Sequence, residues 1–126
     1  GEPLSDGTSP SHGADRLGPT AVMNSLGKLD QAKTGGTLLN LRFSPSALAG
    51  ADGPKRLARL VRGYFRQGGH HVQFNVVDEA TLRAAKRSPS DYRSLLVRVA
   101  GYSDYFVDLD ERHQDEIISR TAHARA

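Results

Sequence analysis

Residues 54–77, PKRLARLVRGYFRQGGHHVQFNVV, carry the clearest helix in the sequence and the strand that follows it. Apolar residues recur in the first part at the spacing of one helix face, namely Leu57, Leu60, Val61, Tyr64 and Phe65. Pro54 suits a first helical turn, and Gly68-Gly69 suits the end of a helix. From Val72 to Val77 apolar and polar residues then alternate, which is the period of a strand. These residues predict a helix with its apolar face in the core, followed by a strand.

Upstream of this unit the sequence predicts a strand, a short helix and a loop. Apolar and polar residues alternate through 37–43, which is typical of a half-buried strand, and Gly35-Gly36 separates this strand from what precedes it. Residues 21–29 have apolar positions at helical spacing, and Gly27 weakens the helix that they predict. Residues 1–19 are rich in Gly, Pro, Ser and Asp and predict a loop.

Downstream, a helix, a strand and a last helix are expected. The helix covers 79–86 and ends at Ser88-Pro89. Residues 95–100 predict a strand with apolar residues on both faces, and this strand runs into Gly101. Asp110 to His123 have acidic residues at the start and isoleucines for the core, as expected of a helix oriented by its dipole.

This order of elements predicts an α/β fold in which helices cover a small sheet. We expect the strands at 37–43, 72–77 and 95–100 to form that sheet. Because 95–100 has apolar residues on both faces, we also expect these strands to complete an α/β barrel whose other strands lie outside this chain. Residues 1–126 are treated as one domain, with a loop segment at 1–19, a scaffold at 20–94, a strand and glycine loop at 95–109, and a C-terminal helix at 110–126.

The composition describes a folded, soluble chain without a strong charge bias. Its 126 residues fit one domain, and 17 Lys and Arg against 14 Asp and Glu give a net charge of +3. The two signs alternate along the chain, so we expect no nucleic-acid partner. No apolar run approaches the roughly 20 residues of a membrane span, and the N-terminus lacks the layout of a secretory signal. We therefore expect a cytoplasmic protein with no membrane partner.

Two absences bear on function. The chain has no cysteine, which excludes disulfides, thiolate metal sites and any thiol catalysis carried by this chain alone. It opens Gly1-Glu2-Pro3-Leu4 without Met, so we expect it to have been processed, excised or expressed from inside a longer reading frame, and whether it is a truncation, a cleaved fragment or a separate subunit stays open.

Gly101, at the end of the strand at 95–100, suits a radical centre on the backbone. An unpaired electron on an α-carbon delocalises into the amide nitrogen on one side and the carbonyl on the other, which requires a planar centre. Glycine permits this best, because a side chain on a planar α-carbon would clash with the neighbouring peptide groups, and glycine tolerates unusual backbone angles. Taken alone, a glycine after a strand is most often a turn.

The surrounding residues raise the radical interpretation above that of a simple turn. They read Arg98-Val99-Ala100-Gly101-Tyr102-Ser103, then Phe106-Val107-Asp108-Leu109, Gln114-Asp115-Glu116-Ile117-Ile118 and Arg120-Thr121. This sequence resembles the C-terminal glycyl-radical motif of the pyruvate formate-lyase-like enzymes. Residues 1–7, 36–45 and 68–77 are similar to segments that precede the motif in that family. The resemblance covers the whole chain. Asp104 departs from it, because many members carry a small residue there, and the consequence of this change stays open.

The resemblance implies a division of labour. A radical S-adenosylmethionine activating enzyme, which holds the iron-sulfur cluster, converts Gly101 to a glycyl radical, and the radical then abstracts a hydrogen atom from an active-site cysteine. That cysteine must come from the remainder of the parent enzyme or from another chain. We expect a protein-derived glycyl radical as the cofactor and no other bound group. The resemblance also implies that air cleaves the backbone at the radical glycine.

By the same resemblance, the residues that flank Gly101 serve in recognition by the activating enzyme or in positioning of the loop. They are Arg98, Val99, Ala100, Tyr102 and Ser103. We expect Arg98 to bind carboxylates or backbone carbonyls around the loop. Gly68-Gly69 and the turn at 88–91 are candidate hinges for a loop that opens, or ordinary connectors.

Other candidate sites have simpler interpretations. His70-His71 point to opposite faces of a strand and lack a third ligand, so we expect a structural role and no metal. The acidic residues at 104–111 lack the spacing of a calcium loop. Gly35-Gly36 and Gly68-Gly69 precede strands, unlike the glycines of a phosphate-binding loop.

The sequence thus favours the radical-bearing part of a lyase, decarboxylase, dehydratase or formate acetyltransferase of the glycyl-radical family. One alternative is a stand-alone subunit that replaces a damaged radical domain. Residues 1–30 argue against it, because a subunit built around the glycine loop alone does not need this upstream segment of family-like sequence. Another is a non-catalytic α/β interaction domain in which Gly101 is only a turn. Substrate, reaction class and oligomeric state stay open.

Overall fold

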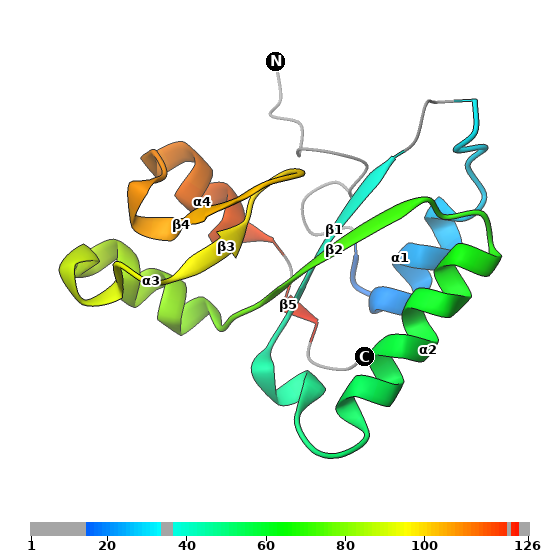
Figure 1. Ribbon diagram of the computed structural model, residues 1–126, viewed down its shortest axis with the longest axis horizontal. Coiled ribbons are helices and arrows are strands. Elements are labelled where there is room, and N and C mark those ends of the chain that lie inside the picture. The colour runs from blue at the N-terminus through cyan, green and yellow to red at the C-terminus, as the bar shows by residue number, and fades with distance from the viewer. Residues whose placement is uncertain (1–14, 34–36, 121, 124–126) are drawn as a thin grey trace.

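A computed structural model describes residues 15–33, 37–120 and 122–123 (Figure 1). The helices are α1 Pro19–Leu26, α2 Gly53–Arg66, α3 Glu79–Arg87 and α4 Glu111–Ser119. The strands are β1 Leu38–Phe43, β2 His71–Val76, β3 Leu96–Arg98, β4 Ser103–Tyr105 and β5 Ala122–His123. Short 3₁₀ helices lie at η1 Pro45–Leu48, η2 Pro89–Tyr92 and η3 Phe106–Asp108.

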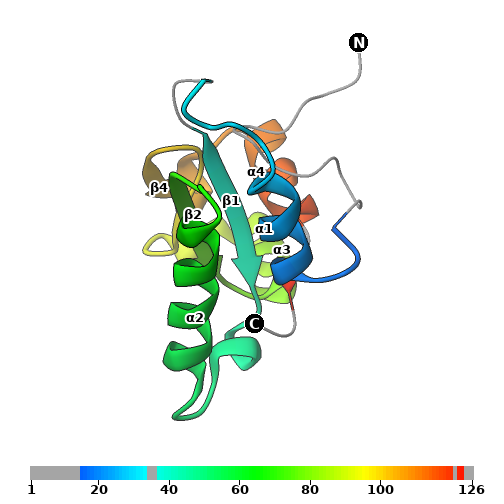
Figure 2. The same cartoon turned by 90° about the vertical axis from the view of Figure 1, so that its right-hand side faces the viewer.

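The central layer is a parallel sheet in the order β2-β1-β5. Leu38 pairs with His71 and Phe43 with Val76, so β1 and β2 run side by side over their whole length, joined by α2. Figures 1 and 2 show α1 and α2 on one side of the sheet, and α3, α4, β3 and β4 on the other. The α/β fold with helix-covered strands is therefore confirmed.

A separate apolar core lies on each side of the sheet. The first is built from α1, β1, η1 and α2, and its buried members are Val22, Met23, Leu39, Leu41, Phe43, Ala47 and Tyr64. The second joins α3, α4, β3 and η3, and its buried members are Val77, Leu82, Ala85, Val97, Val99, Phe106, Ile117 and Ile118. Both faces of the sheet are thus covered, as in an α/β domain.

The strand β1 is buried on both faces, although its alternation predicted a half-buried strand. Asn40 and Arg42 are only 8% and 2% exposed, because the second core and the segments around it cover their side. Burial lowers the pKa of the Arg42 guanidinium. On α2, the sequence placed Phe65 in the core, but its side is open and the residue is 47% exposed.

The expected place of the strand at 95–100 in the sheet is wrong. Its central part, β3, pairs antiparallel with β4 through Leu96 to Tyr105 and Arg98 to Ser103, so the two strands make a separate hairpin. The reason is that the chain reverses direction in a tight turn after Val99, so that β4 lies beside β3 and pairs with it. Leu96 is 56% exposed, so β3 is not buried on both sides by this chain. The third place in the sheet is taken by β5.

The C-terminal helix is shorter than the sequence predicted. It starts where expected, because the Asp110 side chain accepts a hydrogen bond from the His113 N–H at 3.0 Å as a helix N-cap. It ends at Ser119, since Arg120 is extended and the chain then joins β1 as β5. Nearer the N-terminus, α1 ends at Leu26 with Gly27 as its cap, short of Leu29, to which the sequence extended this helix.

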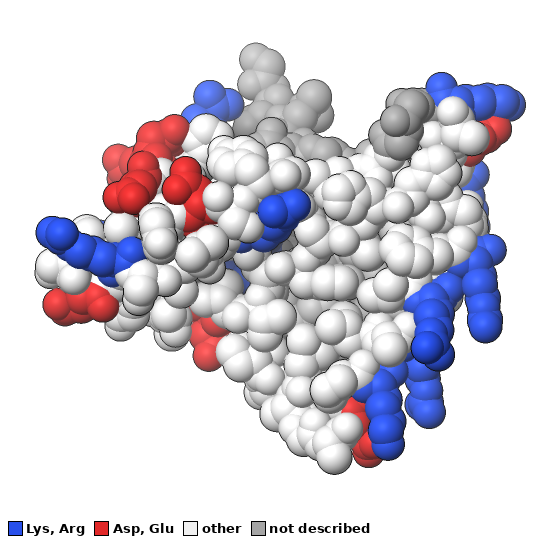
Figure 3. Space-filling view, viewed as in Figure 1, with Lys and Arg blue, Asp and Glu red and all other residues white. Residues whose placement is uncertain are grey.

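Lys and Arg gather along one side of the molecule, whereas the Asp and Glu at the opposite end stand among further Lys and Arg (Figure 3). Lys and Arg lie over α2, which contributes Lys55, Arg56, Arg59, Arg62 and Arg66. Asp and Glu lie over the end formed by β4, η3 and the start of α4. No described helix has the length and apolar character that crossing a bilayer requires.

Candidate functional site

Gly101 lies at the tip of the β3–β4 hairpin. The turn of the hairpin is closed by a hydrogen bond from the Val99 N–H to the Tyr102 carbonyl at 2.9 Å. The φ angle of Gly101 is +77°, a conformation that glycine adopts easily and other residues adopt with strain. A Cβ at this position would meet Leu38 Cδ2 at 3.9 Å, an ordinary contact. The backbone conformation therefore favours glycine here, whereas the space around Gly101 would also accommodate a Cβ.

The residues next to Gly101 are open to solvent. Gly101 and Ser103 are exposed, Tyr102 is 48% exposed, and Ala100 is half-buried. Val99, by contrast, is 1% exposed and packs in the second core. The hairpin thus has a buried base and an exposed tip.

The carboxamide of Asn75 on β2 binds the backbone of Arg98 at this base. Its Nδ2 donates to the Arg98 carbonyl and its Oδ1 accepts from the Arg98 N–H, each at 2.7 Å. A side chain therefore satisfies both polar backbone groups of Arg98, as a neighbouring strand would. The hairpin is fixed on the face of the sheet by this contact.

Arg120, the residue after α4, binds the same base from the other side. Its Nη1 donates to the Arg98 carbonyl at 3.3 Å and its Nη2 to the Val99 carbonyl at 3.0 Å. Nη2 also lies 3.1 Å from Glu116 Oε1, and the two side chains are only 13% and 20% exposed. One guanidinium therefore holds the two carbonyls that precede Ala100 and Gly101, and Glu116 balances its charge.

The Arg98 side chain extends a polar ladder across four strands. Its Nε donates to Gln73 Oε1 at 2.7 Å and its Nη1 to Ser103 Oγ at 3.3 Å, while Gln73 Nε2 donates to Asn40 Oδ1. The expected partners of Arg98, carboxylates or backbone carbonyls, are wrong for the described residues, because Gln73 and Ser103 lie nearer. Around this hairpin, Arg120 binds the backbone carbonyls that were expected for Arg98.

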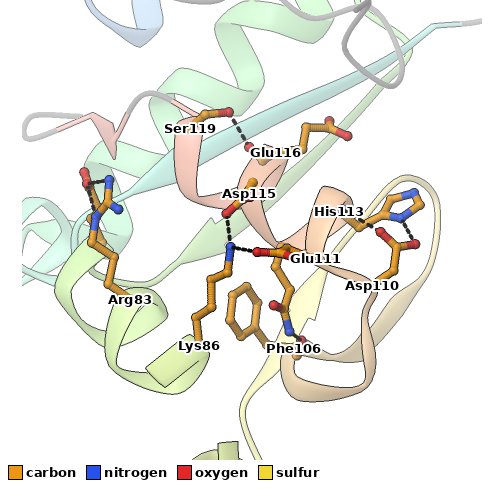
Figure 4. A network of polar contacts seen from close by, with 11 residues as sticks. Arg83, Lys86, Phe106, Asp110, Glu111, His113, Asp115, Glu116 and Ser119 are labelled. Carbon is orange, nitrogen blue, oxygen red and sulfur yellow. Dashed lines mark hydrogen bonds and ion pairs between the residues drawn. The ribbon is translucent and has the colours of Figure 1, made fainter. Parts of the chain in front are cut away.

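Beneath the hairpin, α3 and α4 are joined by ion pairs (Figure 4). Lys86 Nζ lies 2.5 Å from Asp115 Oδ1 and 3.1 Å from Glu111 Oε1, and the hydrogen bond to Asp115, with that to Glu111, raises the pKa of Lys86. The Phe106 carbonyl accepts from Gln114 Nε2 at 2.9 Å. The ion pairs of Lys86 join α3 to α4, and the bond from Gln114 fastens Phe106, the residue after β4, to α4.

Other residues singled out from the sequence lie away from Gly101 or act locally. The Asp104 carboxylate accepts from the Tyr105 N–H at 2.8 Å. The His70 N–H donates to Gln31 Oε1 at 2.9 Å, and the described residues include no group of three or more His, Asp or Glu arranged to hold a metal. Gly69 packs so tightly on Tyr64 that a Cβ would approach the ring to 2.4 Å, which is typical of a packed connector.

Sequence reasoning missed the two residues that hold the hairpin base. Arg120 stands in the text that resembles the glycyl-radical motif, but nothing in its spacing indicates that it folds back on residues 98 and 99. Asn75 belongs to the polar face of β2, and a polar face predicts exposure. Asn75 and Gln73 are both only 7% exposed, and this burial reveals their role.

Comparisons with known proteins agree with this geometry. A family model described as "Glycine radical" matches residues 4–107. The chain is 55% identical to trans-4-hydroxy-L-proline dehydratase from Clostridioides difficile, over 95% of this chain and 15% of the relative. It is 47% identical to (2S)-3-sulfopropanediol dehydratase from Klebsiella oxytoca, over 95% of this chain and 15% of the relative.

Solved structures give the same result. The B12-independent glycerol dehydratase from Clostridium butyricum, in its glycerol-bound form, superposes with a TM-score of 0.94 at 53% identity, covering 98% of this chain and 16% of that one. The chain therefore spans about 15% of the length of the curated relatives that it matches.

Proposed function

The chain belongs to the glycine radical family, and from that premise we propose that Gly101 is the residue that stores the unpaired electron. The chain is the radical-storing domain of a glycyl radical enzyme, with a protein-derived cofactor. Gly101 is assigned this role because it lies at the tip of a hairpin whose base is held by Asn75 and Arg120. That single arrangement carries the proposal.

Radical formation at Gly101 removes one hydrogen atom from its α-carbon. The electron that remains is stabilised when the α-carbon and both flanking peptide groups lie in one plane. A φ of +77° turns the preceding peptide group far out of that plane. The tip therefore flattens when the hydrogen atom leaves, and glycine allows the rotation because it has no side chain to clash.

We propose two partners for Gly101, one that removes its hydrogen atom and one that later gives a hydrogen atom back. A radical S-adenosylmethionine activating enzyme, which carries its own iron-sulfur cluster, takes the hydrogen atom and contacts the exposed tip. Ala100, Tyr102 and Ser103 suit recognition because they are wholly or partly accessible, whereas Val99 and Arg98 serve to position the tip.

The second partner is a cysteine outside these 126 residues, since the chain has none. Gly101 takes the hydrogen atom of its S–H group, which restores the glycine and leaves the unpaired electron on sulfur. The thiyl radical then attacks the substrate. We propose that this cysteine lies in the remainder of the parent enzyme, in an α/β barrel that the strands of this chain adjoin.

For the parent enzyme we propose a lyase reaction. The relatives and the solved structure compared above are named as dehydratases, and each contains a segment at least 47% identical to this chain. A cytoplasmic location is part of the proposal, because a free thiol and an iron-sulfur cluster both need a reducing compartment. A non-catalytic interaction domain is not favoured, because the family match includes Gly101 and the residues around it.

Electron paramagnetic resonance of the parent enzyme tests the assignment. After anaerobic activation we expect a doublet, because the one α-hydrogen left on Gly101 splits the signal. Gly101→Ala should abolish it. Gly50→Ala is the matched control, since Gly50 has a similar φ of +81° and open space around it. A doublet that survives in Gly101→Ala would show that the radical lies elsewhere.

A further inference from the structure

Two side chains from outside the hairpin hold the peptide groups that lead to Gly101. Asn75 binds the N–H and carbonyl of Arg98, and Arg120 binds the carbonyls of Arg98 and Val99 at 3.3 and 3.0 Å. Val99 is buried, and its N–H closes the hairpin on the Tyr102 carbonyl. The backbone is therefore held up to Val99 and again at the Tyr102 carbonyl, and Ala100 and Gly101 lie between these two points.

We propose that Arg120 is a positioning residue for the radical centre, and that Asn75 assists it. The inference rests on the proposed function of Gly101. Arg120 fixes the Val99 carbonyl while the tip flattens, so that the rotation is confined to residues 100–102. The α-carbon of Gly101 then keeps its place relative to the donor and the acceptor of the hydrogen atom.

The chemistry of Arg120 suits this task better than that of a lysine. A guanidinium presents several N–H donors in a rigid plane, so one side chain spans two successive carbonyls and a carboxylate at once. Glu116, at 3.1 Å from Nη2, keeps the guanidinium oriented toward the hairpin. Because both side chains are largely buried, water competes weakly for these hydrogen bonds.

The position of Arg120 in the chain supports the same role. α4 is fastened to α3 by Lys86 and to η3 by Gln114, and Ile117 and Ile118 near its end are buried in the second core. Immediately after Arg120 the chain joins the central strand β1 as β5. Arg120 therefore connects the tip to the most constrained part of the fold, whereas Tyr102 and Ser103 on the far side of Gly101 are exposed.

The test uses the full parent enzyme with Arg120→Gln, Arg120→Lys and Arg120→Gln/Glu116→Gln, the last of which leaves no unbalanced carboxylate. Arg112→Gln is the matched control, because Arg112 is an exposed arginine on α4, the helix that Arg120 follows. Circular dichroism confirms folding. Two readouts follow: hydrogen exchange of the peptide covering 95–106, and the yield and line shape of the radical signal after activation.

We expect Arg120→Gln and the double variant to lose protection in the 95–106 peptide by about 10- to 150-fold, the range for lost hydrogen bonds to a charged donor. The radical doublet should fall in yield and broaden, because the tip samples more conformations. Arg120→Lys should recover part of both losses, and Arg112→Gln should match the wild type.

The inference is overturned if the folded Arg120→Gln enzyme gives a doublet of wild-type yield and line shape, or if its exchange matches that of Arg112→Gln. The signal of the wild-type enzyme separates a failure of this inference from a failure of the proposed function. If wild-type enzyme itself gives no doublet, the proposed function of Gly101 fails, whatever the variants show.

Discussion

The carboxamide of Asn75 holds the backbone of Arg98 by two hydrogen bonds of 2.7 Å, one to its carbonyl and one from its N–H. Asn75 lies on β2 and Arg98 on β3, in different sheets. A side chain thus takes the place of a strand neighbour, and the hairpin rests on the face of the sheet instead of extending its edge. Gly101 is in this way carried above the start of β1, where Leu38 is its neighbour.

Replacing Asn75 should loosen the hairpin in proportion to the partners that are lost. Asn75→Ala leaves the Arg98 N–H without its partner and the Arg98 carbonyl with Arg120 alone, which should cost about 1 to 3 kcal/mol. Chemical unfolding of the parent enzyme measures the difference. Equal stability of Asn75→Ala and wild type would contradict this account of the hairpin.

Two glycines at α2 should respond in opposite directions to alanine. At Gly69 a Cβ would lie 2.4 Å from Tyr64, whose ring is buried, so Gly69→Ala should destabilise the protein by roughly 1 to 3 kcal/mol through overpacking. Gly63 lies inside α2 with nothing within 4 Å of its Cβ position, so Gly63→Ala should stabilise by about 0.5 to 1 kcal/mol. Thermal unfolding midpoints decide both. A shift of the same sign in the two variants would be inconsistent with this packing.

His123 should make the fold sensitive to mild acid. It is 4% exposed, its ring lies 5.7 Å from that of Phe43, and burial lowers its pKa below the ordinary 6.5, against the opposing charge of Asp15. The folded state thus favours the neutral ring. Its contribution to stability is full above pH 6.5 and is lost as pH falls from there through the lowered pKa.

Stability measured against pH for wild type and His123→Gln checks this expectation. Wild type should lose stability below pH 6.5 more steeply than the variant. His113 is the matched control, since it is an exposed partner of Asp110 on α4 and its replacement should leave the acid response from His123 in place. Parallel curves for wild type and His123→Gln would rule out His123 as the source.

Much of the fold follows from local periodicity in the sequence. The helix and strand at 54–77 and the helix at 79–86 are found within one or two residues of their expected ends, because each has a long apolar pattern and a clear stop. Gly101 is likewise found at the end of a strand, where the text around it indicated a special role. These features depend on residues close together in the chain.

The parts that the sequence did not predict depend on distant residues. β4 and β5 have three and two residues, too few for a period, and their pairing is decided by the turn at Gly101 and by the end of α4. Asn75 and Arg120 are polar and were not assigned to the site, because their partners lie 23 and 21 or 22 residues away. The pattern of apolar residues along the chain cannot predict that a polar side chain is buried, because that burial depends on segments that pack on it from elsewhere in the fold.

The central claim, that Gly101 carries the unpaired electron, is tested most directly by exposing the activated parent enzyme to air and weighing the products by mass spectrometry. Oxygen adds to the radical carbon and breaks the backbone there, so the account predicts two fragments whose ends meet at Ala100 and Gly101. Unactivated enzyme should stay intact. An intact activated chain that had shown the doublet, or cleavage at another glycine such as Gly50 or Gly68, would contradict the assignment.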